Sequence, residues 1–170
     1  MHYLNNAGAA IMSDETLEAV LGHYALEREF GPYSAARRVA DQLDAGYASA
    51  ASVLGVDQRG ISMHDSASRA WDMAVYGAGL KRGDVIVTLS SEFGTNLVSL
   101  HHYASQVDAV VKVVDCDPLG DFDLGALEAR IADGAKLVAV SHAAAHGSIV
   151  NPVAEIGQLA TKYGAAYVID

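Results

Sequence analysis

Three segments of the sequence combine side chains suited to ligand binding with the predicted end of a strand. They are Ser66–Trp71, Ser91–Asn96 and Tyr167–Asp170. In open parallel sheets, ligands bind beyond the carboxyl ends of the strands, so these segments would share one edge of a sheet. Each also has a purely structural explanation.

The first segment offers a place for an anion. The small side chains of Ser66, Ala67 and Ser68 precede a predicted helix and leave its first N–H groups accessible. Because the helix dipole favours negative charge there, a phosphate could bind the N–H groups of Ala67 and Ser68 and the Ser68 hydroxyl. Taken alone, a serine at a helix start is more often only the cap.

The two other segments carry an aromatic and an acidic side chain. Phe93 follows the predicted strand 84–89 and can stack on a planar ring, or simply fill space in the core. Asp170 ends an apolar strand, where burial disfavours its charge. A protonated ring nitrogen would keep this carboxylate ionised; the alternative is an aspartate that caps the next turn.

Composition and charge exclude several classes of protein. The 170 residues carry a formal net charge of −10, which argues against a nucleic-acid or anionic-membrane surface. No apolar run approaches the length of a membrane span, and the start lacks a signal-like pattern. The single cysteine, Cys116, cannot form an internal disulfide, so we expect a cytoplasmic protein.

Strands and helices are predicted to alternate over most of the chain. Ser13 caps a predicted helix that runs to about Glu29, and a second helix covers 34–54. Predicted strands cover 61–64, 84–89, 109–114, 136–140 and 166–169; predicted helices cover 67–79, 94–106, 123–131 and 153–163. The Val- and Ile-rich strands predict a mainly parallel sheet covered on both faces. We expect a three-layer α/β/α domain over 1–170, with an N-terminal arm and helix at 1–32.

The sequence ends at Asp170, directly after a predicted buried strand. Strands of such sheets normally lead into loops and helices that cover them. We therefore expect another polypeptide to cover the apolar surface at this end.

Five segments in register resemble the class V aminotransferase family, which includes cysteine desulfurases, selenocysteine lyases, isopenicillin N epimerase-like proteins and C–S lyases. The segments are Leu4–Ala10, Ser66–Ala74, Glu92–Asn96, Ser141–Pro152 and Ala166–Asp170. The resemblance covers essentially the whole chain. It implies the N-terminal half of the large domain of a fold type I pyridoxal-phosphate enzyme.

The resemblance assigns the cofactor contacts. Ala67 and Ser68 would bind the phosphate of pyridoxal phosphate, and Phe93 would stack on its ring. Asp170 would keep the pyridine nitrogen protonated, so that the ring can accept electrons from the substrate.

The resemblance also assigns the phenolic edge of the cofactor and the substrate side. His142 and Ala145 would lie along the phenolic edge, although alanine cannot donate the hydrogen bond that relatives make there. His146 or a water molecule is left to replace it. The residues expected near the substrate are Asn6, Ala7 and Gly8.

The family's cofactor-binding lysine has no counterpart in this sequence. In relatives it follows the aspartate that here is Asp170. The four lysines present lie beside a turn, in a strand, at a strand start and on a helix: Lys81, Lys112, Lys136 and Lys162. None suits the role, so we expect no covalent chemistry from this chain alone.

Three explanations of the missing lysine remain open. We favour a split enzyme, in which a separate chain supplies the lysine and the C-terminal half, and two such heterodimers could pair. The reaction would be C–S or C–Se lysis, racemisation or epimerisation, or transamination of an amino acid. The alternatives are a piece of a longer chain and a non-catalytic scaffold that kept the fold.

A metal site is not expected. His101 and His102 are adjacent on a predicted helix and therefore face different directions. The supporting cysteine or carboxylate spacing of a metal site is also missing.

Overall fold

The computed structural model describes residues 2–145 and 149–170. Its internal contacts divide the chain into two compact units, residues 1–61 and 62–170, and each is described by itself. The single domain expected over residues 1–170 stays a prediction.

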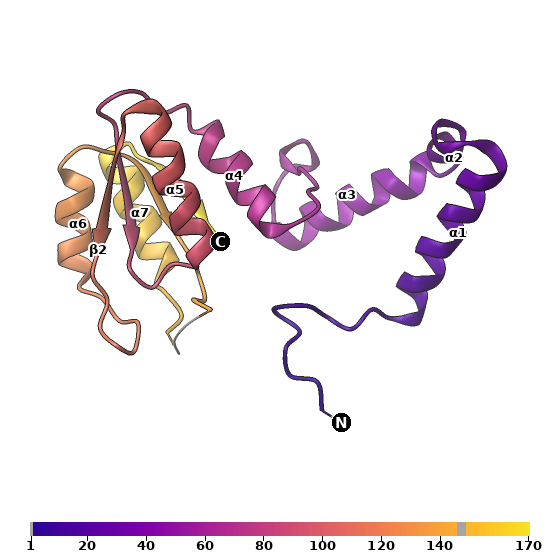
Figure 1. The fold of residues 1–170 in the computed structure, drawn as a ribbon, viewed down its shortest axis with the longest axis horizontal. Coiled ribbons are helices and arrows are strands. Elements are labelled where there is room, and N and C mark those ends of the chain that lie inside the picture. The colour runs from indigo at the N-terminus through magenta and orange to yellow at the C-terminus, as the bar shows by residue number, and fades with distance from the viewer. Residues whose placement is uncertain (1, 146–148) are drawn as a thin grey trace. The chain divides into compact units, whose positions relative to one another are not determined.

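The first unit is helical (Figure 1). Its helices are α1 (Asp14–Phe30), α2 (Pro32–Arg38), α3 (Ala40–Leu54) and the short 3-10 helix η1 (Gln58–Gly60). The Oγ of Ser13 accepts a hydrogen bond from the Thr16 N–H at 3.2 Å, so the predicted cap of α1 is confirmed. Gly55 ends α3 in the left-handed conformation, with φ 66°.

The single helix predicted over 34–54 is wrong, because the chain leaves the helical conformation at Val39 (φ −112°, ψ 18°). A β-branched side chain loses rotamer freedom in a helix, which makes Val39 a favourable place for the break. Just before it, the Arg38 guanidinium lies 3.8 Å from the centroid of the Phe30 ring, which ties α2 to α1.

The strand predicted over 61–64 is also wrong, because these residues are irregular. Ser62, Met63 and His64 are exposed, and no strand of the described residues pairs with them. A strand needs both a hydrogen-bonded neighbour and a buried face. Ser62 and His64 instead bind each other, Oγ to Nε2, at 3.0 Å.

The second unit contains a parallel sheet, as predicted. Its strands lie in the order β2-β1-β3-β4, and all three neighbouring pairs are parallel. Their bounds are β1 (Val85–Leu89), β2 (Val110–Val114), β3 (Ala135–Val140) and β4 (Ala166–Ile169). Because the strands are parallel, their carboxyl ends share one edge.

Helices cover both faces of this sheet (Figure 1). They are α4 (Ala67–Gly77), α5 (Gly94–Val107), α6 (Leu124–Ala132) and α7 (Val153–Tyr163). On one face, Ile86 and Leu137 pack with side chains of α4 and α5; on the other, Val87 and Val138 pack with side chains of α6 and α7. The predicted three-layer α/β/α arrangement is confirmed.

Among the helices of the described residues, none has both the length and the apolar character needed to cross a membrane.

We predict that Leu137→Ala lowers the free energy of unfolding by about 2–5 kcal/mol, because it leaves a cavity at a fully buried position. The fluorescence of Trp71, the single tryptophan, reports the change during urea denaturation because Trp71 packs in the same cluster. Val98→Ala is the control, since Val98 is exposed on α5 and its loss should cost less than about 0.5 kcal/mol. Equal midpoints for both variants would contradict the assignment of this core.

Candidate functional site

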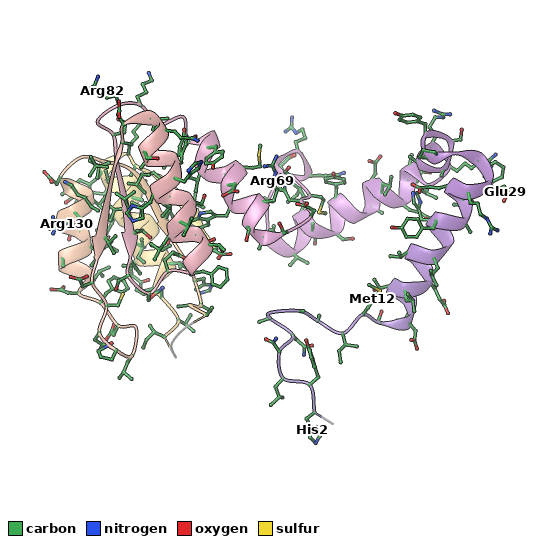
Figure 2. The ribbon with its side chains drawn as sticks, in the orientation of Figure 1. His2, Met12, Glu29, Arg69, Arg82 and Arg130 are labelled. Atoms are coloured by element: carbon green, nitrogen blue, oxygen red, sulfur yellow. The ribbon has the colours of Figure 1, made fainter. Side chains whose placement is uncertain are left out.

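The N-terminus of α4 presents free backbone donors. Ser66 caps the helix, with its Oγ accepting the Arg69 N–H at 3.2 Å. Figure 2 labels Arg69 in this first turn. The N–H groups of Ala67 and Ser68 have no acceptor among the described residues, and both residues are exposed. This helix end can therefore bind an anion.

A pocket of about 240 Å³ lies between α4 and the end of β4. It is lined by Ala67, Ala70, Trp71, Ala74, Val168, Ile169 and Asp170. The structure thus brings together Ala67 and Asp170, two of the predicted site residues. The pocket is smaller than the roughly 300–1,000 Å³ of a typical small-molecule site, so it can enclose only part of a cofactor.

One buried donor, on a residue that lines this pocket, has no partner among the described residues. The Trp71 side chain is only 4% exposed, and its Nε1 makes no hydrogen bond among the described residues. A buried unpaired N–H is unfavourable, and Nε1 itself is not exposed to the pocket. The free helix end, apolar walls and terminal carboxylate together suit a flat ligand with an anionic group.

Next to the pocket, a buried carboxylate gathers donors from two segments. Glu92 is 4% exposed and accepts hydrogen bonds from the Phe93 N–H at 2.8 Å and from Asn96 Nδ2 at 3.0 Å. It also accepts the Ser141 N–H at 2.6 Å and the Ser141 hydroxyl. Its partners in the described part of the chain are neutral donors, which replace the water that the carboxylate has lost.

Asp170 is held by both its side chain and its backbone. Its Oδ2 accepts a hydrogen bond from Asn96 Nδ2 at 2.7 Å. Its N–H donates to the Val140 carbonyl at 3.0 Å, and its carbonyl accepts the His142 N–H at 2.7 Å. The ladder of β3 and β4 therefore continues to the last residue and fixes this carboxylate at the sheet edge.

Other predicted cofactor residues lie outside the pocket lining. Phe93 is the N-cap residue of α5 and 39% exposed, and Ser68 is exposed in the first turn of α4. The side chain of His142 is exposed, although its backbone binds Asp170. Ala145 is exposed. The roles of these side chains toward a cofactor stay predictions, and His146 lies outside the described residues.

The predicted substrate residues lie in the first unit. Asn6, Ala7 and Gly8 are exposed in a turn closed by the hydrogen bond from the Ala9 N–H to the Asn5 carbonyl, at 3.0 Å. Because the two units are described separately, their substrate role stays a prediction.

Two residues of the polar network around Glu92 are absent from the site predicted from the sequence: Asn96 and Ser141. One local signal was available: Glu92 and Asn96 are four residues apart at a helix start, and so share a face. Their contacts with Ser141 and Asp170 span 49 and 74 residues, which no local pattern encodes. In the described residues, no three His, Cys, Asp or Glu side chains come together as a metal site.

Several curated relatives of this chain have names that refer to reactions at sulfur. The chain is 30% identical over 175 residues to a probable cysteine desulfurase of Synechocystis sp., covering 99% of this chain and 42% of the relative. It is 27% identical to a probable hercynylcysteine sulfoxide lyase of Mycobacterium tuberculosis, with the same coverages. The chain thus spans less than half the length of these curated relatives.

Solved structures share the fold. The apo cysteine desulfurase of Thermococcus onnurineus NA1 matches with a TM-score of 0.74 and 28% identity, covering 80% of this chain and 34% of that one. A variant of C-DES with glycine covalently linked to its PLP cofactor matches with a TM-score of 0.82, covering 98% and 44%. At 22% identity, the second likeness supports the fold alone.

The architecture is accordingly that of the fold type I pyridoxal-phosphate enzymes, over the N-terminal part of their length. The family model for class V aminotransferases matches residues 2–170. The chain therefore belongs to the class V aminotransferase family.

Proposed function

We propose that this chain is the cofactor-binding, N-terminal half of a pyridoxal-phosphate enzyme that acts on an amino acid. A separate partner chain would supply the lysine. The observation that carries the proposal is the pocket in which Ala67, at the free N-terminus of α4, and Asp170, at the end of β4, meet.

The pocket residues fit pyridoxal phosphate. The unpaired N–H groups of Ala67 and Ser68 would bind the phosphate, aided by the dipole of α4. Asp170 would hold a proton on the ring nitrogen between the apolar walls of the pocket. When bound, the cofactor supplies a ring that accepts electrons from the substrate.

Phe93 would cover one face of the ring. Its side chain is partly exposed at the start of α5, and its N–H is anchored on Glu92. A phenyl ring can stack and exclude water, but it cannot carry a proton. Proton transfer on that face would therefore need a group other than Phe93.

The lysine positions indicate that the cofactor-binding lysine is not one of the four lysines of this sequence. Among the described residues, no lysine lines the pocket. Lys112 binds Asp133 at 2.5 Å and Lys162 binds Glu128 at 2.8 Å. Lys81 precedes β1 and so lies at the amino end of the sheet, away from the pocket. Because matched relatives are more than twice as long as this chain, the missing lysine fits within the unmatched part of their length.

Uncovered apolar surface supports the same proposal. Within the described residues, β4 pairs only with β3, and Ile169 is 48% exposed. In the first unit, a groove of about 730 Å³ lies between α1 and α3 and is lined by residues such as Val20, Tyr24 and Leu43. A partner that covered both would form an obligate complex, and two heterodimers could pair again.

The names of curated relatives support a sulfur-containing substrate. Desulfurase and sulfoxide lyase both denote reactions at sulfur, which favours cleavage of a C–S or C–Se bond over epimerisation or transamination. We place the complex in the cytoplasm, a choice supported by the single free cysteine, Cys116.

The first prediction concerns the phosphate. Ser68→Glu should weaken cofactor binding by about 10-fold or more, because a carboxylate at the helix end repels the phosphate. Acidic residues stabilise helix N-termini, so the variant should fold normally. Fluorescence titration with pyridoxal phosphate measures the change, with Ser68→Ala as the control for loss of the hydroxyl alone. Equal affinity of Ser68→Glu and the unchanged protein would contradict the phosphate site.

The second prediction concerns Asp170. In the assembled complex, Asp170→Ala should lower kcat by on the order of 10²–10³-fold while only modestly weakening cofactor binding, because the ring nitrogen loses its counter-charge. Asp170→Asn should behave similarly, although it keeps an acceptor for Asn96. Asp115→Ala is the control, since Asp115 is exposed just after β2 and outside the pocket. Undiminished turnover of Asp170→Asn would remove the proposed role.

The partner is tested by purifying this chain alone and together with the candidate chain that carries the C-terminal half. With added pyridoxal phosphate, only the pair should show the visible absorbance of a lysine-bound cofactor, and only the pair should release sulfide or selenide from cysteine or selenocysteine. A reading frame that continues past Asp170 and contains the lysine would show a single longer chain instead. No absorbance from a folded pair would leave only the scaffold explanation.

A further inference from the structure

We infer that Asn96 is a positioning residue, which fixes the Asp170 carboxylate so that one of its oxygens stays available to the ring nitrogen. The inference rests on the proposed function and gives a role to Asn96 and Glu92, which both lie outside the pocket lining. Asn96 is 2% exposed and links Asp170 to the buried Glu92 through one amide nitrogen.

The orientation of the Asn96 amide follows from its neighbours. Its Nδ2 lies 3.0 Å from Glu92 Oε1 and 2.7 Å from Asp170 Oδ2. Both are carboxylate oxygens, which only accept hydrogen bonds when ionised, and an amide nitrogen has two hydrogens to donate. A flipped amide would place its own oxygen against both carboxylates. The nitrogen therefore faces them, one hydrogen to each.

Glu92 fixes the amide from the other side. Glu92 Oε1 also accepts the Phe93 N–H and the Ser141 hydroxyl, and its Oε2 accepts the Ser141 N–H. Ser141 is itself held, because its carbonyl accepts a hydrogen bond from Asn151 Nδ2 at 2.8 Å. Asn96 consequently cannot rotate without leaving a buried charge short of a donor.

Asp170 is left with one engaged oxygen and one free oxygen. Within the described residues, Oδ2 accepts the Asn96 hydrogen bond, and Oδ1 has no donor. The carboxylate lines the pocket, so the free oxygen is the one that can meet a protonated ring nitrogen. Without Asn96, the carboxylate could rotate about its Cβ–Cγ bond, and Glu92 would lose a donor.

The test uses the assembled protein loaded with pyridoxal phosphate carrying ¹⁵N in its ring. Asn96→Ala should shift the ring ¹⁵N resonance toward the unprotonated position and lower kcat about 10-fold or more, with KM changed less than about 3-fold. Asn96→Ser, which keeps a single short donor, should give intermediate values. Ser99→Ala is the matched control, because it removes another side-chain hydrogen bond of α5, to Asp72 Oδ1 at 2.5 Å, and neither of these residues lines the pocket. Thermal unfolding by circular dichroism confirms that each variant is folded.

The outcomes separate the inference from the proposed function. A protonated ring nitrogen in the unchanged protein and in Asn96→Ala, with equal kcat, would overturn the role of Asn96 and leave the function standing. If Asn96→Ala does not fold, an unaltered ¹⁵N resonance and kcat in Asn96→Ser would overturn it instead. Failure of the unchanged protein to bind the labelled cofactor would overturn both.

Discussion

The burial of one carboxylate, Glu92, constrains the whole carboxyl edge of the sheet. Among the described residues no cation pairs with it, so its charge depends on neutral donors that must be held in place. These donors come from the start of α5 and from Ser141 after β3. Asn96, one of them, also donates a hydrogen bond to Asp170 and so links Asp170 to Glu92. One buried charge thus fixes three segments that are far apart in the sequence.

The sheet topology explains why these segments meet. From β1 the chain crosses to β2 on one side, whereas β3 returns to pair with the other side of β1. The strand order therefore reverses between β1 and β3, and ligands in open α/β sheets bind at such a switch point. Glu92 follows β1 and Ser141 follows β3, so the polar network fills this point and the pocket opens beside it, toward β4 and α4.

Local patterns in the sequence predict most of the helices and strands. What they do not predict depends mostly on contacts between residues far apart in the sequence. Runs such as Val85–Leu89 and caps such as Ser13 define their own elements, because burial and capping act over a few residues. The predictions of an unbroken helix through Val39 and of a strand over Ile61–His64 were wrong. Whether a helix breaks or a strand finds a partner depends on residues outside the segment itself. The shared edge of a parallel sheet predicted that Ala67 and Asp170 lie together, although the strand expected before Ala67 does not form. The hydrogen bond between Asn96 and Asp170 depends on the assembled sheet and has no local signal.

The position of Trp71 gives the protein a built-in optical reporter. It is the single indole of the chain and forms part of the pocket wall. A conjugated pyridine ring bound against this wall would lie close to the Trp71 indole and would accept its excitation energy. Quenching of intrinsic emission would then follow occupancy directly, without a label, even where no covalent bond to the protein is made.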